Sequence, residues 1–312
     1  MEHKYYTADA HCDFLYFAAT ENFKIETLQK YQCMNLDRMK KGNVKLQFFA
    51  AWTDFREKRR SPLQQGLEMM AAYHRMLDEN PNDLVSLTKD FEPSCGKTAT
   101  VLAIEDLTCM EGNLANLEIF YHLGVRAATL IWNYKNDLAC PAKGHFDGGL
   151  SPLGKATVKK MEKIGMATDF AHLSDRGIDD VLEITSSPVF SSHTNARGLY
   201  YHPRSLCDEH IKEIAKRGGV IGINFFHEQL CDRRLANSKD IADQIEYTAK
   251  VGGIDCVAIG SDFDGMSVYP EDVKHSGDLQ TIAKELEMRG FSHEDIEKVM
   301  YSNLEKFIKQ FV

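Results

Sequence analysis

The chain has 312 residues, of which 43% are hydrophobic and 27% are charged, an ordinary balance for a soluble globular protein. A formal net charge of −9 leaves no broad basic surface for phosphate backbones, which excludes nucleic acid as an expected partner. No stretch approaches the roughly 20 apolar residues of a membrane span, and the opening MEHKYYTADAHCD lacks the pattern of an export signal. We therefore expect a cytoplasmic protein with no membrane partner.

Short apolar runs alternate along the chain with amphipathic stretches of helical spacing. The apolar runs predict eight strands, at 7–11, 44–52, 100–105, 125–132, 166–172, 188–193, 220–225 and 256–262. The amphipathic stretches predict helices at 63–79, 113–123, 152–164, 175–185, 208–217 and 238–251. Two further helical segments, 277–288 and 292–311, follow the last strand.

Most of these strands are apolar without strict alternation, which indicates a parallel sheet covered on both faces. Eight strand-then-helix units are the number that closes a barrel, so we predict a (β/α)8 TIM barrel that forms one domain over residues 1–312. The last two helical segments are expected to supply the eighth barrel helix and a C-terminal helical cover. An open doubly wound sheet is the alternative, but no G-x-G-x-x-G follows the first strand and no P-loop occurs.

Polar residues stand at or just past the ends of several predicted strands. The C-terminal ends of barrel strands converge on one face, where active sites are built, so residues far apart in sequence become neighbours there. The residues concerned are His11, Asp13, Glu105, His172, His193 and Asp262.

The residue types in this set suit zinc. His11 and Asp13 lie two positions apart and point to the same side of an extended segment, whereas Cys12 between them points away. A buried carboxylate such as Glu105 needs a cation or a proton, and between two metals it offers one oxygen to each; a salt bridge to Arg126 is the alternative. Imidazoles fit zinc well, so His172 and His193 complete a set of five ligands.

Five ligands with one shared carboxylate fill two zinc sites and leave positions open for water, which is typical of catalytic zinc. The nucleophile we expect is a hydroxide that bridges the two ions. Asp262 lies between Gly260 and Gly265, where the backbone approaches the barrel mouth, and is a candidate to take and give a proton. Asp264, two residues later, competes for this role, but the interpretation we favour is a surface residue or one that braces a loop. The eight cysteines show no C-x-x-C spacing and are interpreted as reduced packing residues.

At these motifs the sequence resembles the membrane (renal) dipeptidases, zinc peptidases built on a metal-dependent hydrolase barrel. The segments that carry the resemblance are DAHCD, the glutamate of LAIED, GLSPLGKATVKKMEKIGM, DFAHLSD, SSHTNARGLYYHPRSLCDEHIKEIAKRGGVIGINF and IGSDFDG. The resemblance implies His11 and Asp13 on one zinc, His172 and His193 on the other, and Glu105 bridging both.

The resemblance also implies roles that spacing does not reveal. Asp262 would carry the proton from the attacking water to the leaving amine, and Arg204 of HPRSL would hold the substrate's terminal carboxylate. Dipeptides with a D-residue at the C-terminal position would be accepted. Exported members carry a signal peptide and a lipid anchor, and their absence here fits a soluble microbial-type relative.

One position departs from the family. Where better-known members carry a substrate-contacting histidine after the fourth strand, this chain has Trp132. The indole either lines a substrate pocket and alters specificity or packs under the barrel rim without a catalytic part. Asp106 stands where glycine is common, and Ala171 where serine is common; neither change removes a ligand.

Three functions stay open at this stage. The favoured one is a metallodipeptidase; a binuclear zinc amidase or lactamase acting on another small amide or ester is the second, motivated by Trp132. A non-catalytic metal-binding relative is the third. The sequence does not decide between a monomer and a homodimer.

Overall fold

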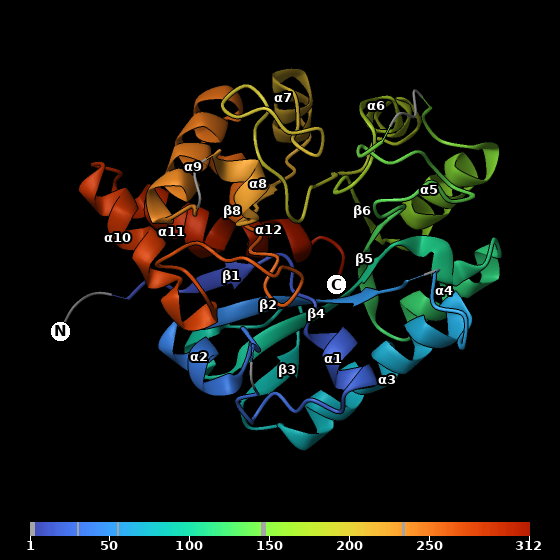
Figure 1. The fold of residues 1–312 in the computed structure, drawn as a ribbon, viewed down its shortest axis with the longest axis horizontal. Coiled ribbons are helices and arrows are strands. Elements are labelled where there is room, and N and C mark those ends of the chain that lie inside the picture. Colours follow the sequence, from blue (N-terminus) through green and yellow to red (C-terminus); the bar gives the residue numbers. More distant parts are fainter. Residues whose placement is uncertain (1–3, 30, 55, 145–147, 233–234) are drawn as a thin grey trace.

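The computed structural model describes residues 4–29, 31–54, 56–144, 148–232 and 235–312. Its centre is a parallel sheet with the strand order β6-β5-β4-β2-β1-β8-β7. The strands are β1 (Thr7–Asp9), β2 (Val44–Trp52), β4 (Thr98–Glu105), β5 (Val125–Thr129), β6 (Ala167–Asp169), β7 (Ile221–Ile223) and β8 (Val257–Ile259). Figure 1 shows β1, β2 and β4 at the centre of the molecule, with helices around them.

The ring between β6 and β7 is closed by the predicted strand at 188–193. This segment is reduced to two parallel bridges, Asp169 with Phe190 and Ser191 with Ile221. Seven of the eight predicted strands are therefore found as strands and the eighth as isolated bridges, and the barrel fold is confirmed. A further short strand that was not predicted, β3 (Leu84–Ser86), pairs with β4 outside the ring.

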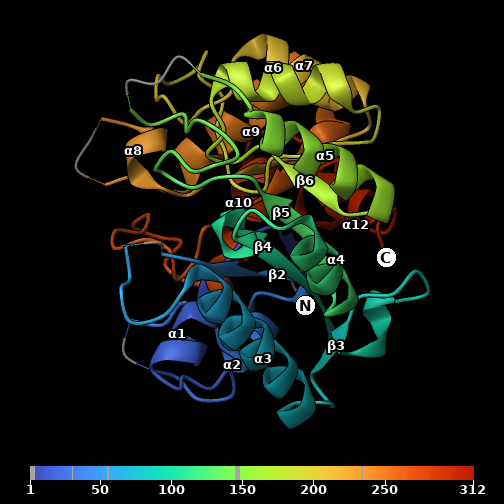
Figure 2. The same ribbon diagram turned by 90° about the vertical axis from the view of Figure 1, so that its right-hand side faces the viewer.

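The predicted helices are also found, with ends that shift by at most three residues. They are α3 (Pro62–Glu79), α4 (Leu114–His122), α5 (Pro152–Ile164), α6 (Asp175–Ile184), α7 (Asp208–Lys216), α9 (Ser238–Gly252) and α10 (Gln280–Met288). Serine side chains cap the first turns of α3, α5 and α6, where Ser61, Ser151 and Ser174 accept a backbone N–H. Helix α4 packs on β5 and α5 on β6 (Figure 2).

The predicted segment 292–311 is helical without a break from 293 to 308, with a π-helical turn in its middle. Its parts are α11 (His293–Glu297), the π-helical turn (Lys298–Ser302) and α12 (Asn303–Ile308). Phe307 of α12 packs against Phe190 with ring centroids 4.9 Å apart, inside a buried cluster that also contains Phe48 of β2 and Ala258 of β8. The C-terminal helices thus cover one end of the barrel, as predicted.

Three short helices were not predicted. They are α1 (Phe14–Thr20), α2 (Leu36–Lys41) and α8 (His227–Leu230). Helix α1 follows directly on the first candidate ligands, with Asp13 at its N-cap position, so it extends the loop region above the C-terminal end of β1. Within the described ranges, every helix is too short or too polar to cross a bilayer.

Candidate active site

The predicted site residues are brought together at the C-terminal ends of the strands. Glu105 is the last residue of β4, and the others follow β1, β6, the bridged segment at 190–191 and β8. Their exposed fractions are small: His11 2%, Asp13 7%, Glu105 3%, His172 6% and His193 1%. Their ligand atoms form three overlapping groups, each with all its atoms within 4.8 Å: His11 with Asp13 and Glu105, Glu105 with His172 and His193, and His11 with His193 and Asp262.

Glu105 lies between the two pairs that the sequence proposed. Its Oε2 atom is 3.3 Å from His11 Nε2, and its Oε1 atom is 2.8 Å from His172 Nε2 and 3.7 Å from His193 Nε2. His11 Nε2 is also 3.4 Å from Asp13 Oδ2. One carboxylate therefore presents one oxygen to each side of the cluster. The alternative of a salt bridge to Arg126 is wrong, because the Arg126 guanidinium donates to the carbonyls of Tyr121 and Val125.

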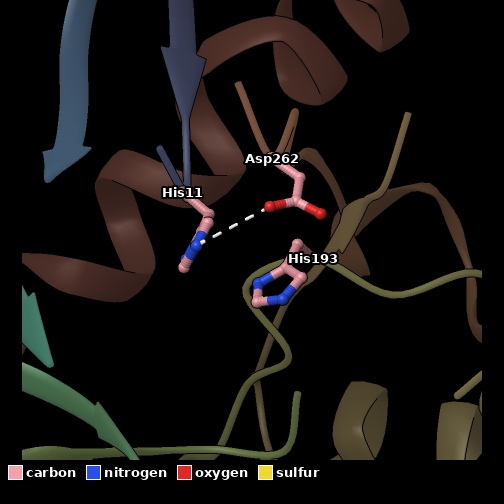
Figure 3. A group of neighbouring side chains, drawn as sticks. All are labelled: His11, His193 and Asp262. Atoms are coloured by element: carbon pink, nitrogen blue, oxygen red, sulfur yellow. Dashed lines mark ion pairs between the residues drawn. The ribbon is translucent and has the colours of Figure 1, made fainter. Parts of the chain in front are cut away.

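Asp262 approaches the same cluster from β8. Its Oδ1 atom is 3.9 Å from His11 Nε2, and the two side chains face each other beside His193 (Figure 3). Asn224 donates to its Oδ2 atom at 3.4 Å and to the carbonyl of His193 at 3.3 Å. Asp262 thus sits at the edge of the cluster with one oxygen held from outside.

Burial sets the charges of these groups. It raises the pKa of Glu105 to about 8, with the Asp13 carboxylate adding to the effect, and it raises the pKa of Asp262 to about 7. Burial lowers the pKa values of His172 and His193 well below the usual range. Both rings are therefore neutral, the form in which imidazole binds a metal.

The unpaired atoms of the cluster fit a cation. His11 Nε2 and Asp13 Oδ1 are buried without a hydrogen-bond partner. His172 Nε2 and His193 Nε2 lie only 3.0 Å apart, and two neutral imidazoles whose lone pairs face each other repel unless a cation or a proton lies near both. Three imidazoles and several carboxylates in a buried space are a donor set suited to zinc.

Hydrogen-bond partners outside the cluster hold the Nδ1 atoms of two histidine rings, so that the Nε2 atoms face inward. His172 Nδ1 lies 3.0 Å from Asn133 Oδ1, and His193 Nδ1 lies 2.8 Å from Ser192 Oγ. A proton held on Nδ1 by such a partner leaves the Nε2 lone pair free. Neither Asn133 nor Ser192 was predicted from the sequence, although both stand next to residues that were singled out there.

Two buried aspartates hold the strand ends from inside the barrel. Asp169 Oδ1 accepts from Ala171 N and Ser192 N, both at 2.9 Å. Asp9 Oδ1 accepts from Ser261 N at 2.8 Å and from His11 N at 3.4 Å. Each aspartate thus ties the end of its own strand to that of its neighbour, next to a predicted site residue. The only hint in the sequence is an aspartate within an apolar run, in DAH and DFAH.

The backbone is strained where the strands turn into the site. His172, Asp262 and Asp106 adopt the left-handed region with φ of 69°, 62° and 74°, which costs on the order of 1 to 3 kcal/mol for a residue that is not glycine. The left-handed backbone at Asp106 explains physically why a glycine suits that position. Gly265 is required for space, since a Cβ there would lie 2.2 Å from Asp13 Oδ2.

A cavity of about 280 Å³ opens over the cluster. Its lining includes Asp13, Glu105, His172, Asp262, Arg204 and Trp132. Arg204 is 7% exposed, and its Nη1 atom has no hydrogen-bond partner. Within the described ranges Arg204 makes no ion pair. Burial lowers its pKa only to about 10, so the guanidinium remains charged. An unpaired buried cation that lines a cavity suits an anionic group of a ligand.

The side-chain contacts also place three other residues singled out in the sequence. Trp132 lines the cavity, with its ring centroid 6.3 Å from that of His172, a position that fits the interpretation of an indole in a substrate pocket. Asp264 accepts from the backbone N–H groups of Cys33 and Met34 and so braces a loop, as expected. Cys12 donates to the carbonyl of Phe48 and faces away from the cluster, and all eight cysteines are free.

Comparison with known proteins gives consistent matches over the whole chain. The sequence model of the membrane dipeptidases, peptidase family M19, matches residues 1–311. A Schizosaccharomyces pombe protein named uncharacterized dipeptidase C965.12 is 31% identical, over 95% of this chain and 78% of its own length. Mouse Dipeptidase 3 is 27% identical, over 88% of this chain and 57% of its own length.

Two solved structures are similar over almost their full length. The dipeptidase AC, described as a metallopeptidase of family M19, has a TM-score of 0.89 at 22% identity and is matched over 99% of both chains. A metallopeptidase from Rhodobacter sphaeroides, liganded with a phosphinate mimic of the dipeptide L-Ala-D-Ala, has a TM-score of 0.89 at 19% identity, over 99% of this chain and 100% of its own. The barrel fold and the resemblance drawn from the motifs are both confirmed.

Proposed function

Because the chain belongs to the membrane dipeptidase family, peptidase family M19, and is a metallodipeptidase, we propose that it uses two zinc ions to hydrolyse the peptide bond of free dipeptides. In this proposal His11 and Asp13 hold one ion, His172 and His193 hold the other, and Glu105 binds both. The observation that carries it is the position of Glu105, whose two oxygens face His11 on one side and the two other histidines on the other.

Zinc held by these residues would supply a water of lowered pKa as the nucleophile and would polarise the scissile carbonyl. The side chains of the cavity do the rest. Arg204 binds the terminal carboxylate of the dipeptide through its planar fork of donors. This contact fixes the substrate by its C-terminal end and places its last peptide bond over the cluster.

Asp262 is proposed to carry the proton. Its carboxylate takes a proton as water attacks and gives it to the nitrogen of the leaving residue. The position supports this role, because Asp262 lines the cavity and faces His11 at the edge of the cluster. Its Oδ2 atom is held by Asn224, which leaves Oδ1 directed towards the cluster.

We include dipeptides with a D-residue at the C-terminal position among the substrates. The R. sphaeroides neighbour was solved with a mimic of such a dipeptide, L-Ala-D-Ala. If the carboxylate and the scissile carbonyl are the two fixed points of the substrate, the side chain of the second residue is left to the cavity wall, so either configuration can be accommodated.

The test is zinc analysis combined with a panel of L,L and L,D dipeptides. We expect two zinc ions per chain and release of free amino acids, which chelation abolishes and zinc restores. Asp262→Asn should keep the zinc and lower kcat by about 100-fold or more, as loss of a general acid–base group does. Zinc-loaded protein that releases no amino acid from any panel member would refute the proposal.

A second candidate is favoured by Trp132, which stands in the cavity where the family has a substrate-contacting histidine. In this alternative the same zinc site cleaves another amide, a lactam or an ester. Dipeptides amidated at the C-terminus, together with Arg204→Met, separate the two functions. For a dipeptidase both changes should raise KM by more than about 30-fold, the effect of losing a hydrogen bond to a charged group. The control Arg176→Met, on the exposed side of α6, should leave KM unchanged. Undiminished activity after both changes would favour the second candidate.

A further inference from the structure

A row of aromatic side chains forms one side of the cavity. We call Tyr16, Phe17, Trp52 and Trp132, which all line it, the aromatic wall. Successive rings are in contact: Tyr16 and Phe17 lie 5.5 Å apart between centroids, Tyr16 and Trp52 5.3 Å, and Trp52 and Trp132 4.9 Å, each pair edge-to-face. All four residues are only partly buried, so the wall offers apolar surface to whatever occupies the cavity.

The wall is held in place from outside the cavity. The Arg56 guanidinium lies 5.4 Å from the ring centre of Trp132 and 5.0 Å from that of Tyr134. Two hydrogen bonds to Asp54, of 2.7 and 2.9 Å, fix the guanidinium in this position. A stacked and anchored cation restricts the rotation of the indole. Trp132 is thus a pre-organised surface, and little side-chain entropy is lost when a ligand packs against it.

The barrel places Tyr16 and Trp52 of the aromatic wall opposite Arg204. Tyr16 follows β1 and Trp52 is the last residue of β2, whereas Arg204 follows the bridged segment at 190–191. Trp132 follows β5, two strands from that segment, and extends the wall through its contact with Trp52. In the closed ring β2 and that segment are four strands apart out of eight, which is the largest separation the ring allows. The predicted metal ligands lie between them. A dipeptide with its carboxylate on Arg204 and its scissile carbonyl over the cluster therefore directs its first residue towards the wall.

We propose that the aromatic wall binds the side chain of the N-terminal residue and selects dipeptides in which that residue is large and apolar. Trp132 is the specificity-determining residue of this subsite, and it replaces a polar imidazole by an indole. The inference rests on the proposed function, because that function fixes the direction of the substrate. Phe226 also lines the cavity, but it follows β7 on the Arg204 side and is placed to meet the second residue instead.

The test compares three substrates that differ only in where a benzyl group stands: Ala-Ala, Phe-Ala and Ala-Phe. We expect kcat/KM for Phe-Ala to exceed that for Ala-Ala by about 10- to 100-fold, the range for burial of a large apolar side chain. Ala-Phe should gain less than Phe-Ala. In Trp132→His the ratio of Phe-Ala to Ala-Ala should fall by about two- to tenfold, as expected for loss of an aromatic pair. Trp132→Phe, which keeps an aromatic apolar surface, should retain most of the preference.

Binding separates this inference from the proposed function. Phosphinate analogues of Phe-Ala and Ala-Ala, which are not hydrolysed, are titrated into the zinc-loaded protein by calorimetry. Binding of the Phe-Ala analogue that is tighter by tenfold or more supports the subsite, whether or not any dipeptide is cleaved. Failure to cleave any dipeptide would overturn only the proposed function. Hydrolysis with equal kcat/KM for Phe-Ala and Ala-Ala, a preference shown by Ala-Phe instead, or a ratio that is unchanged in Trp132→His would overturn the inference.

Discussion

Gly265 offers a direct test of how closely the site is packed. Its backbone conformation is open to any L-residue, so Gly265→Ala adds only a methyl group. That Cβ would lie 2.2 Å from Asp13 Oδ2 and 2.5 Å from Asp262 Oδ1, where ordinary contacts begin at 3.4 Å. Both carboxylates must therefore retreat by roughly 1 Å, and a displacement of this size at a reacting centre costs on the order of 100-fold in rate.

The expected result is loss of function without loss of fold. In Gly265→Ala we expect kcat/KM to fall by about 100-fold or more and the zinc content to drop towards one ion per chain, because Asp13 is a proposed ligand. Zinc is measured by mass spectrometry after dialysis, kcat/KM on the preferred dipeptide, and stability by thermal unfolding.

Gly290→Ala is the matched control. A Cβ there meets nothing within 4 Å, but the residue has a φ of +83°, so the cost is backbone strain of about 1 kcal/mol. The control should lose a few degrees of thermal stability and keep its activity and both zinc ions, which is the reverse of the Gly265 variant. Gly265→Ala with normal kcat/KM and two zinc ions would show that the positions of Asp13 and Asp262 do not matter as argued.

Three further predictions concern two residues around the site and a buried histidine of α7. Asp169→Ala should weaken zinc binding by about 10- to 100-fold in a chelator competition. Asp169→Asn, whose amide oxygen can still accept both backbone N–H groups, should bind zinc nearly as well as the unchanged protein. Equal loss of zinc affinity in both variants would mean that the charge of Asp169, and not its hydrogen bonds, is needed. Asn133→Leu removes the partner of the His172 ring and should release one zinc on dialysis, so retention of both ions would contradict the role given to Asn133. Burial alone lowers the pKa of His210, but contacts with Cys207 and Asp179 raise it to about 9. Since this pKa is above the unfolded value of about 6.5, the stabilisation is complete below pH 6.5 and is lost as the pH rises towards 9. We expect the free energy of unfolding to fall by about 1 kcal/mol over that range after allowance for solvent screening. Chemical denaturation at a series of pH values should show this fall in the unchanged protein and not in His210→Gln.

The fold was predictable because its signals are local and repeated. Strands such as β4 contain an apolar run, here 101–104, and helices such as α5 begin with a serine cap followed by proline. The short helices α1, α2 and α8 were missed because they have four to seven residues, too few to show a helical period. The predicted helix at 292–311 contains a π-helical turn, which has no composition signal of its own.

The site was predictable to the extent that its residues share one position, the end of a barrel strand. Asn133, Ser192 and Asp169 act through contacts between neighbouring strands, and single polar residues of this kind carry no spacing from which a partner could be inferred. Arg204 illustrates the limit most clearly. In sequence it is a loop arginine, which is usually exposed, and only the resemblance to a family marked it; in the structure it is 7% exposed.

The charges of the cavity link its two proposed ligands. On one side carboxylates gather around His11, and burial raises the pKa values of Glu105 and Asp262 towards neutrality. On the other side Arg204 is buried without an acidic partner in the described ranges. The fold alone compensates neither the ionised form of these carboxylates nor the Arg204 guanidinium, and uncompensated buried charge destabilises a folded protein. In the proposed function two cations would compensate the carboxylates and a substrate carboxylate would compensate the guanidinium, so the residues that cost the fold stability would be those that bind the metals and orient the dipeptide.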